Sequence, residues 1–445
     1  MLAIVLCIAS WSCASYPERT QLAYADFERG HLSQAYDAYT NRKTTGSEFL
    51  SGAEAGTVAL ANGQWDDAVQ QFGRAMSVVE DAEREALLSA GNLEDWMLSW
   101  TLNEGAQRYV GEGYERALVH ACSAAARLAR GDLDGARVET KRANALLESE
   151  EALYKKEYRA GGLGHFLSAI VYELDGKPDD AYIDYARMEA KGVGVALASR
   201  ALVRLARVLG RTEELARWTE KYGADDEAVP GNASVIVIAG VGEGPYKQEI
   251  TFPIPTPDGI LQWSVPTYAR RAQCIGDLEL SVAGGSRSVR TIVIEDIGAV
   301  AKENLDDRIL LLSTKSAVRA VLKRELTKQL EKDVGVLGRI AGDIFTFLTE
   351  RADLRSWLTL PDTWQAARAF VPAGEQRLIL DARGGERAEL GSYELAPGET
   401  VFVFARTIGT RLYAHVVGGK RLDSGAPVAL EGEARVEAVP AGEPR

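Results

Sequence analysis

The densest cluster of charged and aromatic residues lies at residues 350–361, where a long helical pattern ends. It contains Glu350, Asp353, Arg355 and Trp357. Asp353 and Arg355 can form a charge-assisted hydrogen bond, and the Trp357 ring can stack on a guanidinium group. A carboxylate and an arginine without a nucleophile or a general base define no reaction. We therefore favour a structural or interaction motif that locks a helix to a sheet over a catalytic site.

A glycine-rich stretch from Gly240 to Gly244 follows an apolar strand pattern and invites comparison with a nucleotide-binding loop. In such a loop a helix follows directly, so that its N-terminus faces the phosphates. Here Pro245 and a second strand pattern follow instead, which argues against nucleotide binding. The sequence also lacks the Walker A, HExxH and GxSxG motifs.

Histidine and cysteine are scarce and widely spaced. Each occurs four times, without a CxxC pair or a histidine partner at the spacing of a metal site. Cys122 and Cys274 are interpreted as packing residues, because buried cysteine usually behaves as a small hydrophobe. We therefore expect no metal, no cofactor and no catalytic residue.

The elements that position these residues begin with an internal repeat. Five segments share a glycine that is followed five residues later by alanine or leucine: Gly30 and Ala35, Gly63 and Ala68, Gly131 and Ala136, Gly176 and Ala181, Gly210 and Leu215. Most intervals between these glycines are about 34 residues or about twice that, which is the period of tetratricopeptide (TPR) repeats. The interval from Gly131 to Gly176 is 45 residues, which indicates a repeat with an insertion. Residues 77–113 form a degenerate unit without a clear turn.

The residue types at these turns have a physical reason. Glycine ends the first helix of a hairpin because it adopts a left-handed conformation at little cost, and alanine lets the two helices approach closely. TPR arrays usually bind partners along a concave groove. The repeats therefore predict a protein partner in such a groove.

Strand patterns replace the helical periodicity beyond residue 231. The candidates are residues 234–239, 248–254, 261–265, 277–282, 288–294, 376–381, 387–395, 400–406 and 411–417. Turn residues between them favour an antiparallel sandwich or barrel. Residues 297–349 predict a helical insert, whose apolar second part at 334–348 either packs against the sheet or touches a membrane or another subunit.

We therefore predict an α+β multidomain chain, with an N-terminal TPR-like α-solenoid and a β-sandwich-like domain that carries a helical insert. The predicted divisions are a leader at 1–14, the helical repeats at 15–222, a linker at 223–231, the β-rich domain at 232–432 and a frayed tail at 433–445. A net charge of −13 argues against broad nucleic-acid binding, which needs a basic face.

The first fifteen residues form a short apolar run that ends in small residues, which is typical of an export signal. Cys13 is a candidate lipidated residue of a bacterial lipoprotein. Cleavage after Ala14 without lipidation, and a buried N-terminal helix, are the alternatives. The leader predicts export, to the periplasmic face of a bacterial membrane, most simply the outer membrane, or to the periplasm or the exterior.

Several segments resemble a known family: Tyr114-Glu-Arg-Ala-Leu118 with Gly131–Asn144, Gly242–Glu249, Thr349–Pro361 with its Asp-x-Arg-x-Trp core, and Pro372-Ala-Gly374. Over almost the whole mature chain, the sequence resembles uncharacterised bacterial TPR-containing envelope lipoproteins that are found beside genes for penicillin-binding-protein activator lipoproteins. It departs from that pattern at the leader, which has an imperfect lipobox around Cys13 and no Lys or Arg. The resemblance implies an envelope location and a link to cell-wall synthesis, and it carries over no catalytic residue.

These observations predict a non-enzymatic cell-envelope scaffold that binds protein partners through its repeats and docks its β-rich half on an envelope complex. One alternative is a hydrolase or glycan-processing enzyme, which needs a cleft with two carboxylates about 5–10 Å apart. A second alternative is a membrane-active oligomeric assembly that uses residues 334–348.

Overall fold

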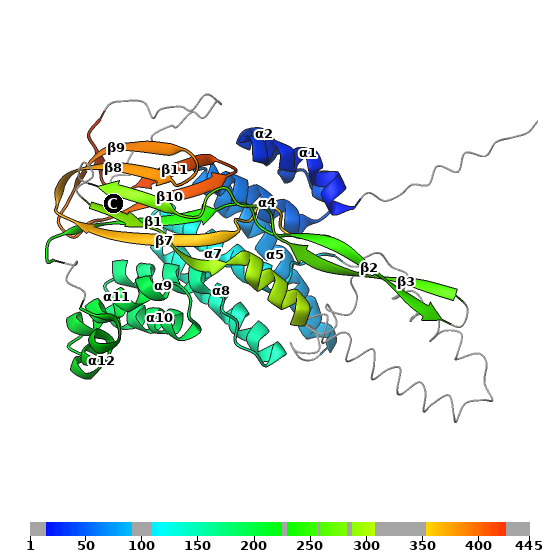
Figure 1. Cartoon of the computed structure of the whole chain (residues 1–445), viewed down its shortest axis with the longest axis horizontal. Helices are drawn as coiled ribbons and strands as arrows, with labels where there is room; N and C mark the ends of the chain where they lie inside the picture. The colour runs from blue at the N-terminus through cyan, green and yellow to red at the C-terminus, as the bar shows by residue number, and fades with distance from the viewer. Residues whose placement is uncertain are drawn as a thin grey trace, which may run out of the picture.

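The computed structural model describes residues 15–90, 108–224, 229–256, 259–282, 287–307 and 353–423. Within these ranges the first half of the chain is helical and the second half consists mainly of strands (Figure 1). Cys13, Glu350 and the predicted tail lie outside the described residues, as does the predicted insert beyond its first helical residues at 297–307.

Helices joined in pairs by short turns form the N-terminal part. The pairs are α1 (Tyr16–Arg29) with α2 (Leu32–Thr40), α4 (Glu48–Ala61) with α5 (Trp65–Ala90), α7 (Gly113–Ala129) with α8 (Leu133–Tyr154), α9 (Gly162–Leu174) with α10 (Pro178–Lys191), and α11 (Val195–Val208) with α12 (Thr212–Tyr222). The short α3 (Arg42–Thr45) lies between the first two pairs. Helical pairs at this spacing are the architecture of TPR proteins.

The repeat glycines lie at the turns inside these pairs. All five have φ between 66° and 80°, a backbone conformation that favours glycine: Gly30, Gly63, Gly131, Gly176 and Gly210. The four repeat alanines are fully buried between helices: Ala35, Ala68, Ala136 and Ala181. A small side chain at that position lets the second helix of each pair lie close to the first.

The described strands form two five-stranded sheets and one separate hairpin. The helix-facing sheet has the order β11 (Arg411–Val417), β10 (Thr400–Ile408), β1 (Ala233–Val241), β7 (Thr363–Val371), β6 (Ile292–Asp296). The outer sheet has the order β12 (Lys420–Arg421), β9 (Arg387–Leu395), β8 (Gly374–Ala382), β4 (Leu278–Val282), β5 (Arg287–Arg290). The hairpin of β2 (Tyr246–Thr256) and β3 (Gly259–Ala269) projects away from both sheets (Figure 1).

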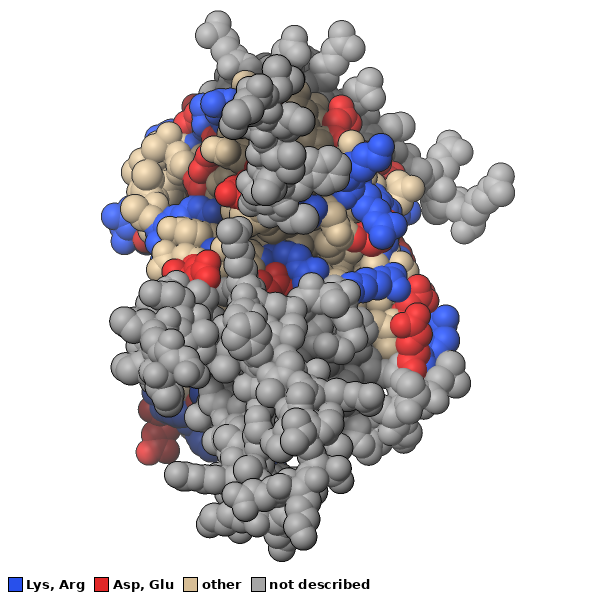
Figure 2. Space-filling model, turned by 90° about the vertical axis from the view of Figure 1, so that its right-hand side faces the viewer, with Lys and Arg blue, Asp and Glu red and all other residues tan. Residues whose placement is uncertain are grey.

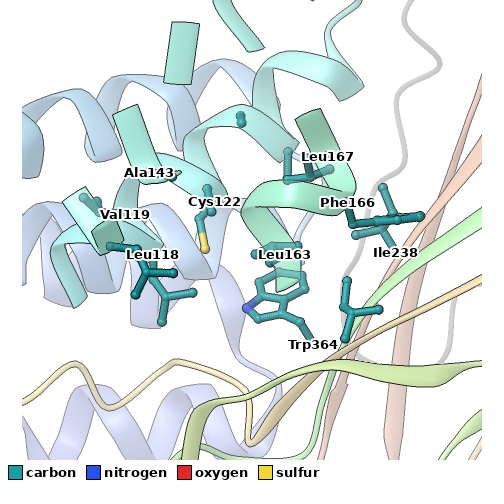
Figure 3. Packing of buried hydrophobic residues seen from close by; sticks show 14 of the residues in the cluster. Leu118, Val119, Cys122, Ala143, Leu163, Phe166, Leu167, Ile238 and Trp364 are labelled. Carbon is teal, nitrogen blue, oxygen red and sulfur yellow. The ribbon is translucent and has the colours of Figure 1, made fainter. Parts of the chain in front are cut away.

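The two faces of β1 explain how the layers stack, because side chains alternate along a strand. Val235 and Val237 belong to the apolar core between the two sheets. Ile236 and Ile238 belong to a second core, which the helix-facing sheet shares with the helices. Figure 3 shows this second core, where Phe166 of α9 lies close to Ile238. The helices, the helix-facing sheet and the outer sheet therefore form three successive layers.

The strands differ from the sequence prediction in three respects. Strand β7 was not predicted, since its alanines and polar residues are poor strand formers, yet it pairs with β1 over nine residues. Strands β1 and β10 are parallel, which the long connection between them permits. The predicted strand at 288–294 is divided at Thr291 into β5 and β6, which belong to different sheets.

Charge is mixed on the surface toward which the β2–β3 hairpin points. Figure 2 shows basic and acidic side chains interspersed over the described part of that face. On that described part, neither sign of charge forms a separate patch (Figure 2). None of the helices in the described ranges combines the length and the apolar character needed to span a bilayer.

Candidate functional site

The first helix of each central pair is covered on all sides. In α4 every residue from Phe49 to Ala61 is buried, and α7 and α9 are almost as completely enclosed. One side of these helices packs on the second helices, and the other side packs on the C-terminal half of the chain. The groove that was predicted to hold a partner is thus filled, along the described part of α4, α7 and α9, by the protein's own residues.

An extended segment at residues 353–361, which we call the groove segment, lies against α4 and α7. Its Trp357 side chain is 1% exposed and packs near Phe72 of α5, with 6.1 Å between the ring centres. The indole N–H of Trp357 donates to the Thr57 hydroxyl of α4 at 3.0 Å. The groove segment therefore inserts its largest side chain between the helices.

Glu54, in the middle of α4, binds the backbone of the groove segment. Its carboxylate accepts the N–H groups of Leu358 and Thr359 at 2.8 and 2.9 Å, and the Tyr16 hydroxyl at 2.6 Å. Burial raises the pKa of Glu54, and the hydrogen bonds that it accepts offset part of that rise. A carboxyl group inside an apolar helix is here an acceptor for an extended chain.

Glu115 has the same role on α7. It accepts the backbone N–H of Trp357 at 2.8 Å and the Tyr109 hydroxyl at 2.6 Å. Burial, with a further contribution from the charge of Glu112, raises the pKa of Glu115 to about 7. Two buried carboxyl groups from different repeats thus bind three successive backbone N–H groups of the groove segment.

The hairpin base and β10 hold the same region from the other side. Lys247 of β2 forms a buried ion pair with Glu112 at the start of α7. The Tyr114 hydroxyl donates to the Tyr268 hydroxyl of β3 at 2.9 Å. Arg406 of β10 donates to the Thr359 carbonyl at 3.1 Å. Helices, hairpin and sheet therefore meet at the groove segment.

Asp353 and Arg355 lie at the start of the groove segment and pair with each other. The Arg355 Nε and Nη2 atoms donate to the Asp353 carboxylate at 2.9 and 2.7 Å, which lowers the pKa of Asp353 against the opposing effect of burial. The Arg355 guanidinium lies over the Tyr109 ring, 4.9 Å from its centre, so the stacking expected on Trp357 is made on another aromatic residue.

Glu295 of β6 joins the sheet to the next repeat. Its two oxygens accept the N–H groups of Gly161 and Leu163, at the start of α9, at 2.9 and 3.0 Å. Burial raises the pKa of Glu295 to about 7, and the two N–H groups offset part of that rise. This contact repeats the pattern in which a buried carboxyl group binds backbone N–H groups across the interface.

Glu173, near the end of α9, makes a different contact with the sheet. It accepts hydrogen bonds from Arg204 of α11 at 2.8 and 3.0 Å, and from Arg368 of β7 at 2.9 and 2.8 Å. Burial favours protonation, but the two guanidinium groups outweigh it and hold the pKa of Glu173 at about 2. This carboxylate is therefore charged and bridges two cations.

Two of the described histidines form structural bonds within a helical pair. His120 of α7 contacts Glu139 of α8 at 2.6 Å, and His165 of α9 contacts Asp184 of α10 at 2.9 Å. Both histidines lie at the same distance before their repeat glycine, so each joins the two helices of one pair. No group of His, Cys, Asp and Glu residues within the described ranges could hold a metal ion.

The carboxyl groups of this interface act as acceptors: Glu54, Glu115 and Glu295 bind backbone N–H groups, and Glu173 binds two guanidinium groups. Sequence reasoning identified the groove segment but missed the carboxylates that bind it. The signal for Glu54 was its position inside the apolar run of α4, because a buried charge needs a partner. The signal for Arg204 was its spacing from Arg200 and Arg207 along one face of α11.

Comparison with known proteins yields structural neighbours only. No family model and no curated protein matches the chain. Two crystal structures of MamA are 14% identical, with TM-scores of 0.31; they match 46% and 45% of this chain and 87% and 92% of their own. PilW, titled a widely conserved type IV pilus biogenesis factor, is 15% identical with a TM-score of 0.24, and the match covers 46% of this chain and 90% of that chain.

Proposed function

We propose that the chain is a non-enzymatic scaffold of the bacterial cell envelope that binds protein partners. The observation that carries this proposal is the array of helical pairs, stiffened by a sheet that fills its concave side. A shared core and buried carboxyl contacts hold the two halves as one body. Such a body offers fixed surfaces for protein partners.

The filled groove directs partner binding to the outward faces of the second helices. Val138 of α8 and Ile183 of α10 are 47% and 50% exposed. Each lies seven residues after its repeat glycine, at Gly131 and Gly176, so the two side chains occupy equivalent places in neighbouring repeats. Apolar side chains repeated on an outward face are suited to bind a partner along the array.

The non-enzymatic part of the proposal is supported by the use of the buried carboxyl groups. The carboxylate oxygens of Glu54 and Glu115 accept hydrogen bonds from backbone N–H and tyrosine hydroxyl groups, and Asp353 is paired with Arg355. The envelope location is supported by the leader sequence around Cys13 and by the resemblance to envelope lipoproteins. A role in cell-wall or envelope assembly follows from that resemblance alone.

Partner binding is tested by cross-linking in cells that carry the tagged full-length chain, followed by quantitative mass spectrometry. We expect a protein that wild type recovers and that Val138→Glu with Ile183→Glu loses by about tenfold. The matched control is Val229→Glu, an exposed valine after the helical half, which should keep the partner. Recovery of the same proteins by wild type, by both variants and by an unrelated bait would refute the proposal.

The envelope location has its own test. The mass of the mature N-terminus reports lipidation, and Cys13→Ala is the control. A mature chain that begins at residue 13 with an acyl mass supports a lipid-anchored scaffold. An unprocessed chain in the cytoplasm contradicts the envelope location without affecting the partner experiment.

A further inference from the structure

A pocket of about 320 Å³ opens between α11 and the strands β5, β6 and β7. It lies where the chain passes from the outer sheet to the helix-facing sheet. Its volume is within the range of about 300–1,000 Å³ that is usual for ligand sites. The groove segment does not line it, because that segment lies against α4 and α7; the interface described above reaches the pocket only through Arg204 and Arg368.

The pocket combines positive charge with an apolar surface. Four arginines line it: Arg200, Arg204, Arg290 and Arg368. The described residues that line it include no Asp or Glu, in a chain whose net charge is −13. Phe370, Leu197, Val289 and Ile292 supply much of the remaining wall. This lining suits an anionic group attached to an apolar side chain.

Glu173 fixes two of the arginines, Arg204 and Arg368, and leaves one buried donor of Arg368 without a partner. Arg368 gives both of its described bonds to Glu173 through Nη1, and its buried Nε atom has no hydrogen-bond partner. A guanidinium group carries five N–H donors in a planar fork that matches a carboxylate. An unsatisfied buried donor is costly, so a hydrogen bond from Arg368 to a ligand oxygen would favour binding of that ligand.

The edge of β7 is open at the same place. The ladder between β6 and β7 ends at the pair of Ile292 and Ala366. From Ala367 to Val371, β7 pairs with β1 on one side and with no described strand on the other. Residues from both faces of β7 line the pocket, as expected where a strand edge is exposed. An open edge beside a pocket is the arrangement that binds an extended peptide by strand addition.

We propose that this pocket binds the C-terminal end of an extended partner polypeptide. The arginines bind the terminal carboxylate, the apolar wall receives the last side chain, and the preceding residues pair with the free edge of β7. This inference rests on the proposed function, because it supplies one way in which a scaffold recognises a protein partner.

The test uses the immobilised full-length chain and a pool of N-acetylated hexapeptides. Five positions are degenerate, the last is Leu, Val or Phe, and the pool is made once as free acids and once as C-terminal amides. Bound peptides are quantified by mass spectrometry. We expect the free acids to be retained about tenfold more than the amides.

Two variants distinguish binding in the pocket from nonspecific attraction of peptide carboxylates to basic side chains elsewhere on the surface. Arg200→Gln with Arg290→Gln changes two arginines at the pocket mouth and leaves the buried bonds of Glu173 intact; the double variant should abolish the preference for free acids. Arg377→Gln changes an exposed arginine of β8 in the outer sheet and should preserve it. Thermal melts confirm that all three chains are folded.

Three results would overturn the inference: equal retention of acids and amides, an equal effect of Arg377→Gln, or full competition by N-acetylphenylalanine at the peptide concentration. The last result would indicate a site for a small organic acid. If peptide binding fails while a partner is still lost with Val138→Glu and Ile183→Glu, only this inference fails. If that partner is absent too, the proposed function fails with it.

Discussion

The helix-facing sheet contacts the helices in two chemically different ways. Toward α4 and α7, buried carboxyl groups accept backbone N–H groups from the groove segment, and no cation contacts Glu54 within the described residues. Toward α9 and α11, Glu295 again accepts backbone N–H groups, but Glu173 bridges the cations Arg204 and Arg368. The first contact closes the groove with the protein's own chain, while the second holds cations beside an open pocket. Both contacts stabilise the fold, but only the second lies beside the pocket in which we propose that a ligand binds.

The largest effect is expected at the groove segment. Replacing Trp357 by alanine removes a fully buried ring and its bond to Thr57, and leaves a cavity beside Phe72. We expect a loss of about 3–5 kcal/mol in the free energy of unfolding, as for other buried tryptophans. Urea unfolding followed by circular dichroism measures it. A loss below about 1 kcal/mol would mean that the groove segment does not hold the two halves together.

A smaller loss is expected in the second region. Glu173→Gln removes the anion between Arg204 and Arg368, so two largely buried cations lose their shared partner. Removing one member of a buried ion pair costs about 3–5 kcal/mol, and we expect the low end because both guanidinium groups remain partly exposed. The control is Glu389→Gln, which breaks an exposed pair with Arg377 and should change stability by less than about 1 kcal/mol.

The two kinds of contact also predict that folding stability depends on pH with opposite signs. Glu115 and Glu295 have a pKa raised to about 7, so they bind protons more tightly in the folded chain than in the unfolded one. Their contribution to the free energy of unfolding is complete below pH 4.5 and is lost as the pH rises through 7. The pKa of Glu173 is lowered to about 2, so its contribution is complete above pH 4.5 and is lost toward pH 2.

Melting temperatures measured at constant ionic strength between pH 5 and pH 8.5 test this sign. We expect them to fall by a few degrees over that range, and Glu115→Gln with Glu295→Gln should flatten the slope. Glu173→Gln should leave that slope in place and weaken the dependence below pH 4.5. A slope of the opposite sign above pH 5 would contradict the role of the two raised carboxyl groups.

The sequence predicted the structure best at positions where a single physical requirement determines the residue type. The repeat glycines could be predicted because a left-handed turn favours glycine at a fixed period, and β1 could be predicted because a strand buried on both faces is uniformly apolar. Strand β7 could not be predicted, since pairing with β1 outweighs the weak strand preference of Ala366 and Ala367. The site divided in the same way: the groove segment was visible as a cluster, but its partners Glu54 and Glu115 are brought to it only by the fold.

The smallest effect on stability is expected at the repeat turns, where the same substitution should cost more beside the sheet than away from it. Gly63 and Gly176 have φ of 71° and 66°, so alanine costs about 1–2 kcal/mol of backbone strain at either position. A methyl group at Gly63 would lie 2.6 Å from the Nδ1 atom of His415 in β11, whereas one at Gly176 meets nothing within 4 Å. We therefore expect Gly63→Ala to lower the melting temperature clearly more than Gly176→Ala does. Equal losses would mean that the sheet does not press on the first turns, and the contrast between the packed and the open part of the array would then rest on the carboxyl contacts alone.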